Sequence, residues 1–364
     1  MNQQTAHEPS APETVTPKKQ GIIDCDVHVS PQHPEQIRRH IAPGWQDRFA
    51  MSGRDLYGHP TYVNRTDANP PSGLPVGSDP DFLRKQLVDE YGMDHLILIQ
   101  RPFTNPQPNP EFATALAAAW NGWIAETWLD AYNHDHVFKG SICVSTQDPA
   151  GAAREIERWA GHPHFVQVVT DSASAAAYGQ RQFDPIYEAC QRLGLPFAMH
   201  AGADGTGITS IPSSGYPTHY IEWSTLHVLS YQTHLVSMLV EGVFERFPEL
   251  KVVLVEGGVS WLPALLWRLD TQYGRFKKEL PWLSRKPSEY IRDHVRFTSQ
   301  PIERPEQDRH LLKMLELMDA EHILMFSSDY PHWDFDSPRL AFPKLPEPLR
   351  SRIYYENARE LYRL

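Results

Sequence analysis

The stretch GIIDCDVHVS, residues 21–30, starts as an apolar run and then places ionisable side chains at every second position. In a β-strand, Asp24, Asp26 and His28 would lie on one face, because successive side chains point to opposite faces. Buried charged groups are normally paired or bound to a metal, since burying an isolated charge is costly. The spacing therefore predicts a strand that ends in metal-binding residues.

Similar apolar, β-branched segments recur along the chain and predict eight strands. They are residues 21–24, 95–100, 137–144, 165–169, 195–200, 251–256, 295–299 and 322–329. Segments with helical patterning lie between several of them, at 109–135, 148–162, 184–194, 234–248 and 305–319. This alternation predicts an α/β fold, a (β/α)₈ TIM barrel, with a doubly wound open sheet as the alternative. No GxGxxG follows the first strand, which weakens a dinucleotide-binding version of that alternative.

Two connections are longer than a compact barrel needs, residues 45–80 after the first strand and 201–232 after the fifth. Both are rich in Pro, Gly and aromatic residues, and we expect them to form lids. Trp45, Tyr57 and Trp223 are the aromatic side chains that we expect to contact an apolar or aromatic substrate. Packing of the lids against the barrel would leave the same pattern, so the two interpretations stay open.

The composition limits the class of protein. The chain has 364 residues and a net charge of −11, which disfavours a nucleic-acid-binding surface but leaves a local basic patch open. No apolar run is long enough to predict a membrane span, and three widely spaced cysteines predict a cytoplasmic protein without a disulfide framework. Residues 1–20 are polar and Pro-rich, so we expect a disordered tail followed by a single domain, residues 21–364.

The carboxyl ends of the strands hold the chemistry in a (β/α)₈ barrel. There the sequence places the ionisable residues Asp26, His28, Arg101, His200, Glu256, Asp329 and His332. Any one of them alone has an ordinary explanation, such as a helix cap, but together they predict a divalent metal ion. We expect Zn²⁺ first, with Mn²⁺ or Fe²⁺ as alternatives. One ion is expected and a second stays open, with ligands drawn from Asp26, His28, His200, Glu256 and Asp329.

In this order the residues resemble the amidohydrolase superfamily. The resemblance is closer to the branch with aminocarboxymuconate-semialdehyde decarboxylase, resorcylate-type decarboxylases and many metal-dependent hydrolases. The stretches that carry it are ERFPELKVVLVEGGVSWLPALLWRLD (245–270), FSSDYPHWD (326–334) and YYENARELYRL (354–364). The resemblance implies that Asp26, His28 and His200 are ligands and that Asp329 binds the metal and handles the water proton. Glu256 stands where such decarboxylases keep a histidine that protonates the substrate.

The absence of that histidine favours hydrolysis as the main hypothesis. A metal-activated water would cleave an amide, ester, lactone or thioester bond, with Asp329 and Glu256 as acid–base groups. His332 would act in catalysis or orient a ligand, and Arg101 would pair with a substrate carboxylate or phosphate, or form a surface ion pair.

Two alternatives stay open at this point. The first is non-oxidative decarboxylation of an aromatic or unsaturated acid, which Arg101 and the aromatic loops permit. The second is a non-catalytic, metal-containing binding protein. The expected partner is a small molecule, with no nucleic acid and no membrane, and the resemblance suggests a homodimer.

Overall fold

The computed structural model describes residues 21–52 and 64–364, so the expected tail (1–20) and Tyr57 lie outside the described residues. Eight parallel strands form one sheet in the order in which they occur along the chain. They are β1 (Ile23–His28), β2 (His95–Ile99), β3 (Phe138–Cys143), β4 (Phe165–Asp171), β5 (Phe197–His200), β6 (Val252–Val255), β7 (Val295–Thr298) and β8 (Leu324–Met325). This sequential parallel order confirms the predicted (β/α)₈ barrel.

The barrel closes between β1 and the segment that follows β8. The backbone N–H of Cys25 donates to the carbonyl oxygen of Phe326 at 3.0 Å, and that of His28 donates to Tyr330 at 2.7 Å. These bonds leave β1 without a free edge. As a result, residues near the two ends of the sequence are fixed side by side at the barrel mouth.

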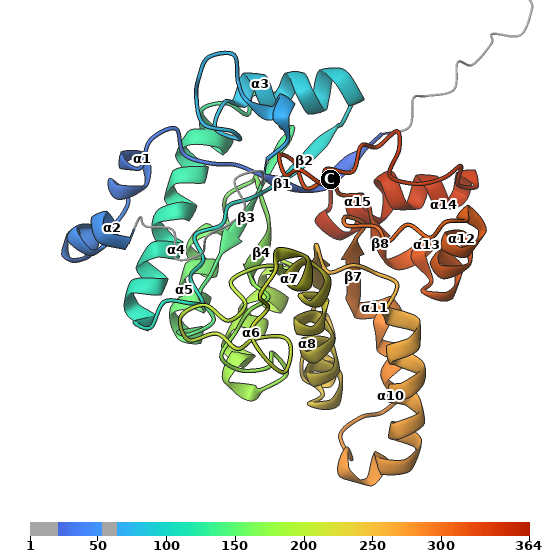
Figure 1. The fold of residues 1–364 in the computed structure, drawn as a ribbon. Helices are drawn as coiled ribbons and strands as arrows, with labels where there is room; N and C mark the ends of the chain where they lie inside the picture. Colours follow the sequence, from blue (N-terminus) through green and yellow to red (C-terminus); the bar gives the residue numbers. More distant parts are fainter. Residues whose placement is uncertain (1–20, 53–63) are drawn as a thin grey trace, which may run out of the picture.

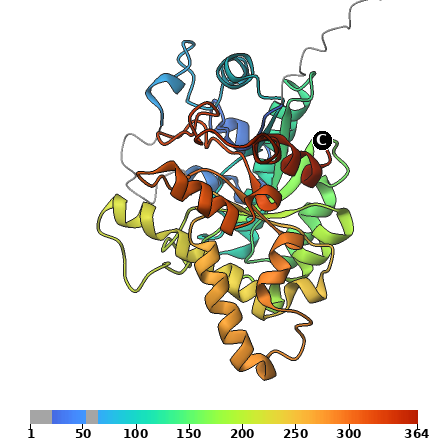
Figure 2. The same ribbon diagram turned by 90° about the vertical axis from the view of Figure 1, so that its right-hand side faces the viewer.

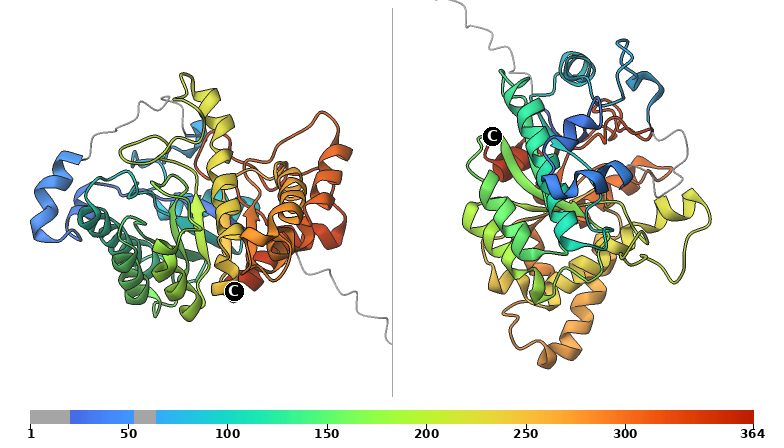
Figure 3. Two further views of the ribbon diagram at one scale, coloured as in Figure 1. Left: turned by 90° about the horizontal axis from the view of Figure 1, so that it is seen from below. Right: turned by 90° about the vertical axis from the view of Figure 1, so that its left-hand side faces the viewer.

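Helices surround the strands, with α4–α6 on one side and α12–α15 on the other (Figures 1 and 3). The first eight are α1 (Glu35–Arg38), α2 (Gln46–Ser52), α3 (Pro80–Arg84), α4 (Pro110–Ile124), α5 (Pro149–Trp159), α6 (Asp184–Leu193), α7 (Tyr220–Leu226) and α8 (Val228–Val240). The others are α9 (Val243–Arg246), α10 (Leu262–Phe276), α11 (Ile291–His294), α12 (Asp308–Leu317), α13 (Ala320–Ile323), α14 (Glu347–Ser351) and α15 (Asn357–Tyr362). Helix α10 projects away from the body of the barrel (Figure 2).

The connections after β1 and β5 are long, as the sequence predicts, and both contain helical turns. Helices α1, α2 and α3 lie between β1 and β2, and α7 lies between β5 and α8. The segment 201–232 is therefore an irregular loop only up to residue 219, after which α7 begins.

The core has two layers. The smaller cluster takes alternate residues from the strands, such as Ile97 with Ile99 and Val253 with Val255, as expected for the inside of a barrel. Helix α15 adds Tyr362 to this cluster, and the larger cluster fills the space between strands and helices. All three cysteines are free and buried. Within the described part of the chain, no helix is long and apolar enough to cross a membrane.

Candidate metal centre

Five side chains converge at the carboxyl ends of the strands. One ligand atom from each lies within 4.8 Å of the others, and we call these residues the strand-end cluster: Asp26, His28, His200, Glu256 and Asp329. The first two come from β1, the third ends β5, and the last two follow β6 and β8. All are buried except Glu256, which is half-buried. The structure thus brings together all five residues that the sequence proposes as ligands.

Asp24 does not join the cluster, although strict alternation places it on the same face as Asp26 and His28. The register between β1 and β2 shifts between Asp24 and Val27. Such a bulge re-aims side chains, and the Asp24 carboxylate accepts backbone N–H bonds from Asp26 (3.2 Å) and Ser328 (2.9 Å). The expectation that all three lie together is wrong for Asp24, which supports the backbone of the site instead.

Glu256 and Asp329 share an uncommon backbone conformation, each with φ near 60°. For a residue other than glycine this left-handed region carries strain, and strain of this kind gathers at functional sites. Tertiary bonds hold both in place. The N–H of Glu256 donates to the Thr298 hydroxyl at 3.0 Å, and its carbonyl oxygen accepts from His227 Nε2 at 3.0 Å. The N–H of Asp329 donates to the carbonyl oxygen of Asp26 at 3.1 Å.

The two cluster histidines face each other with their lone pairs. Nδ1 of His28 lies 3.1 Å from the carbonyl oxygen of Ile99, and Nδ1 of His200 lies 2.9 Å from that of Ala201. A carbonyl oxygen only accepts, so each Nδ1 carries the hydrogen and each neutral ring keeps a lone pair on Nε2. Burial lowers the pKa of both rings, which favours these neutral forms. Yet the two Nε2 atoms lie only 3.2 Å apart.

Two of the three cluster carboxylates, those of Asp26 and Glu256, also have oxygens that lack hydrogen-bond donors. Both side-chain oxygens of Asp26, and Oε2 of Glu256, are buried without a hydrogen-bond partner among the described residues. Burial raises the pKa of Asp26 to about 7, and burial together with the charge of Asp329 raises that of Glu256 well above its ordinary value. A cation between these lone pairs would remove the repulsion between the two Nε2 atoms and would give the unpartnered carboxylate oxygens a positive partner. The donor set of nitrogen and oxygen atoms fits a divalent metal ion.

His332 pairs with Asp329 at the rim of the cluster. Nδ1 of His332 lies 2.7 Å from Oδ1 of Asp329. Burial would raise the pKa of Asp329, but the charge of His332 and its hydrogen bond to Asp329 hold that pKa well below its usual range. Burial would likewise lower the pKa of His332, but Asp329 raises it. His332 is 21% exposed whereas Asp329 is 1% exposed, so this pair links the buried cluster to solvent.

Arg101 stands beside the cluster, where the sequence places it. Its Nη2 donates to the carbonyl oxygen of Ala201, and its Nη1 lies 4.0 Å from Oε2 of Glu256. The guanidinium also lies over the ring of Phe103, 4.7 Å from its centre. A fixed, half-buried cation next to the candidate metal centre suits an anionic ligand.

The expected aromatic residues lie in different places. Trp223 on α7 stacks on His227, with ring centres 5.6 Å apart, and His227 in turn bonds Glu256. Trp45 instead packs on Phe112 of α4, with ring centres 5.7 Å apart. The sequence reasoning missed His227. Its place four residues after Trp223 was the available signal, but that signal requires a helix where a loop was expected.

Comparisons with known proteins agree with this geometry. The family model described as Amidohydrolase matches residues 23–364. Gamma-resorcylate decarboxylase of Polaromonas sp. is 26% identical over 296 residues, which cover 77% of this chain and 86% of the relative. The relative of the same name from Rhodococcus jostii is 24% identical, covering 78% and 87%.

Solved structures show the same fold. The 5-carboxyvanillate decarboxylase of Sphingomonas paucimobilis has a TM-score of 0.69 at 25% identity, covering 95% of this chain and all of that one. A dihydroxybenzoic acid decarboxylase from Polaromonas sp. has a TM-score of 0.64 at 20% identity, covering 94% and 97%, and contains manganese and the inhibitor 2-nitroresorcinol.

These comparisons overturn the main hypothesis of hydrolysis. The two gamma-resorcylate decarboxylases each match more than three quarters of the chain, so preferring hydrolysis because of Glu256 was wrong. The sequence reasoning treated a histidine before the two glycines as essential for protonation. Burial and the charge of Asp329 raise the pKa of Glu256, and Asp329 raises that of His332 against the effect of burial, so the protonated forms of both groups are favoured.

Proposed function

Because the chain belongs to the amidohydrolase family, we propose that it is a divalent-metal-dependent decarboxylase that releases CO₂ from a hydroxylated aromatic acid. The observation that carries the proposal is the pair of facing Nε2 atoms of His28 and His200, beside the unpartnered oxygens of Asp26. Together with the decarboxylase relatives, this arrangement supports metal-assisted removal of a carboxylate by one catalytic domain, residues 21–364.

We assign the metal to Asp26, His28, His200 and Asp329, whose ligand atoms lie within 4.8 Å of one another. When bound, a divalent cation supplies positive charge that holds substrate oxygen atoms and stabilises negative charge. Mn²⁺ is our first choice, since a structural neighbour that is a decarboxylase contains manganese. The donor atoms of the cluster suit Zn²⁺ as well, so the experiment below compares the two.

Arg101 and Glu256 are placed to bind the substrate carboxylate. Arg101 offers a fixed positive charge. Burial and the charge of Asp329 raise the pKa of Glu256 well above its ordinary value, which favours the protonated form, a hydrogen-bond donor that does not repel an anion. Trp223 and Tyr220, whose rings lie 5.5 Å apart on α7, add aromatic surface next to His227, on which Trp223 stacks. These features match an aromatic acid.

The pair Asp329–His332 suits the proton transfer. In decarboxylation the ring carbon gains a proton, the bond from that carbon to the carboxylate breaks, and CO₂ leaves with the ring aromatic again. The imidazolium of His332, stabilised by Asp329 at 2.7 Å, stores the proton. Asp329 delivers it inside the site, and the partly exposed His332 regains one from solvent.

The test is CO₂ release from 2,6-dihydroxybenzoate and 5-carboxyvanillate by protein loaded with Mn²⁺ or Zn²⁺. In D₂O the product is expected to carry one deuterium at the vacated carbon. The variant Arg101→Gln should raise KM more than it lowers kcat, because Arg101 binds the carboxylate but moves no proton. Protein with a full complement of metal that releases no CO₂ from any phenolic acid would overturn the proposal.

A further inference from the structure

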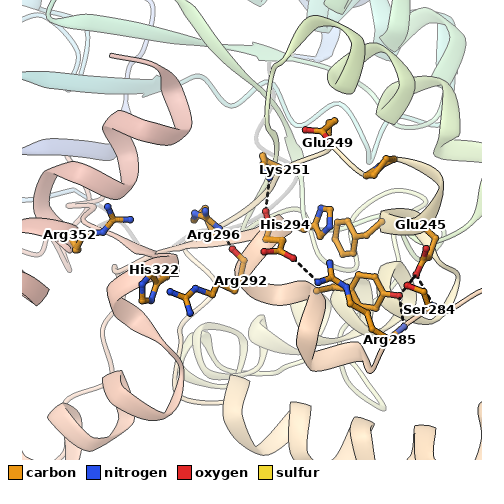
Figure 4. Close-up of a pocket in the computed structure, with 14 residues that line it drawn as sticks. Glu245, Glu249, Lys251, Ser284, Arg285, Arg292, His294, Arg296, His322 and Arg352 are labelled. Atoms are coloured by element: carbon orange, nitrogen blue, oxygen red, sulfur yellow. Dashed lines mark hydrogen bonds and ion pairs between the residues drawn. The ribbon is translucent and has the colours of Figure 1, made fainter.

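A second charged pocket lies at the opposite end of the barrel from the strand-end cluster. Lys251 immediately precedes β6, whereas Glu256 immediately follows it, so the length of one strand separates the two places. The cavity has a volume of about 760 Å³ and is lined by residues around the amino ends of β6 and β7, together with α11, His322 of α13 and Arg352 (Figure 4).

The lining is basic although the chain is acidic. Five arginine and lysine side chains line the pocket against three carboxylates, whereas the whole chain has a net charge of −11. Three of the five have carboxylate partners. Arg285 pairs with Asp293 at 2.6 Å, Arg292 with Asp319 at 3.6 Å, and Arg352 with Glu360 at 2.7 Å.

Arg296 and Lys251 have no such partner. Within the described part of the chain, no carboxylate oxygen lies within 4.0 Å of either charged group, and both donate to backbone carbonyl oxygens instead. Nη1 of Arg296 bonds those of Arg292 and Val295 at 2.9 Å each, and Nζ of Lys251 bonds that of Asp293 at 2.7 Å. Nε of Arg296 is buried without any hydrogen-bond partner among the described residues.

These cations also act on one another. Figure 4 shows Arg296 between Arg352 and Lys251. Burial and the charge of Arg352 lower the pKa of Arg296, and burial and the charge of Arg296 lower that of Lys251. Like charges held together in a partly dry pocket destabilise the free protein. An anion that sits among them would remove this cost.

We propose that the pocket binds a phosphate group, with Arg296 and Lys251 as its principal charged ligands and Arg352 as the third cation. Guanidinium and ammonium groups are the side chains that bind phosphate oxygens most strongly. The volume falls in the range of small-molecule sites and leaves room for an organic group beyond the phosphate. The inference does not depend on the reaction at the other end of the barrel.

The test is the melting temperature of the metal-loaded, full-length protein, titrated with inorganic phosphate or with ribose 5-phosphate. Sodium chloride holds the ionic strength constant. We expect saturable stabilisation by phosphate, because a ligand that binds only the folded state raises its stability. Tighter binding of ribose 5-phosphate would identify a phosphorylated metabolite as the ligand, and equal affinity would identify free phosphate.

Two separate variants test the site. Arg296→Gln and Lys251→Gln are each expected to weaken phosphate binding by about tenfold, the effect of losing one charge-assisted contact. The matched control Arg275→Gln, on the exposed part of α10, should bind phosphate as the wild type does. His200→Ala, at the other end of the barrel, should also bind it and thereby exclude phosphate bound at the metal. Stabilisation equal to that in chloride, or unchanged affinity in both pocket variants, would overturn the proposal.

Discussion

The strand-end cluster and a hydrogen-bonded group that we call the Asn105 network lie at the same end of the barrel. The network contains Asn105, Thr146, Thr170, Asp171, Tyr178 and His234. It begins one strand away from the cluster, since Asp171 of β4 is paired in register with His200 of β5. Both groups are polar and buried, but they differ in whether their polar atoms have hydrogen-bond partners.

In the Asn105 network, donors meet acceptors. Nδ2 of Asn105 lies 2.9 Å from the carbonyl oxygen of Ala173, and its Oδ1 accepts from the N–H of Thr146 at 3.1 Å. In the strand-end cluster, acceptors meet acceptors, as at the two Nε2 atoms of His28 and His200. Because buried polar groups in folded proteins are normally paired, the first group indicates a structural role and the second indicates a cation-binding site.

The largest expected effect is that of Asp329→Asn, which should reduce activity much more than stability. Asp329→Asn removes the carboxylate that we assign to the metal and to the proton, so kcat/KM for decarboxylation should fall by about 10³-fold. The free energy of unfolding should fall far less, since asparagine keeps the size and one side-chain oxygen of Asp329 and loses only the charge that pairs with His332. Steady-state kinetics and urea unfolding measure the two quantities. An Asp329→Asn variant with wild-type kcat/KM would show that the strand-end cluster does not carry the reaction.

The next effect concerns the network and pH. His234 accepts at Nδ1 from the N–H of Tyr178 (3.1 Å) and donates from Nε2 to the carbonyl oxygen of Ser172 (2.6 Å). Burial lowers its pKa to about 4, below the value of about 6.5 expected in the unfolded chain. The unfolded state therefore binds the proton more readily. This contribution to stability is complete above about pH 6.5, and about 3 kcal/mol is lost as the pH falls towards 4.

Urea unfolding between pH 7.5 and 4.5 measures that loss. His234→Gln should show a flatter dependence on pH than the wild type, whatever its stability at neutral pH. The exposed His219 provides the control, and His219→Gln should keep the wild-type slope. If the free energy of unfolding changed with pH equally in the wild type and in His234→Gln, the pKa of His234 would not be lowered in the folded state.

Removing the metal should affect only the strand-end cluster. Protein stripped with a chelator should lose activity and keep its fold, and Mn²⁺ at 100 times its Kd should restore about 2.7 kcal/mol of stability. Melting curves with and without Mn²⁺ measure the change. The shift should shrink in His200→Ala and persist in Tyr178→Phe. An equal shift in both variants would mean that the cation binds elsewhere.

The smallest effect is expected from Tyr178→Phe. The Tyr178 hydroxyl donates to the carbonyl oxygen of Asp171 at 2.5 Å and lies 3.0 Å from Nδ2 of Asn105. Its loss should cost about 1 kcal/mol in urea unfolding, the usual net value of one hydrogen bond. The kcat/KM should stay within twofold of the wild type. A large loss of activity with unchanged stability would mean that the network takes part in the reaction.

The sequence by itself determined the barrel and the five members of the strand-end cluster. Apolar runs mark strands buried on both faces, and the chemistry of a parallel barrel lies where those runs end. Position after a strand was therefore enough to make Asp26, His28, His200, Glu256 and Asp329 candidates, and the resemblance to the amidohydrolase superfamily gave them their roles. Position after a strand could not identify the reaction. The choice between hydrolysis and decarboxylation was made on Glu256, whose pKa depends on its burial and on the nearby Asp329.

Only the tertiary structure decided which polar residues lack partners. The bulge in β1 removes Asp24 from the cluster, and a helix where a loop was expected brings His227 to Glu256. The pocket at Lys251 and Arg296 also forms only when the amino ends of β6 and β7 meet. Local patterns fix which way a side chain leaves its own strand, but hydrogen-bond partners and charges come from segments far away in the sequence, and these set the chemistry of each group.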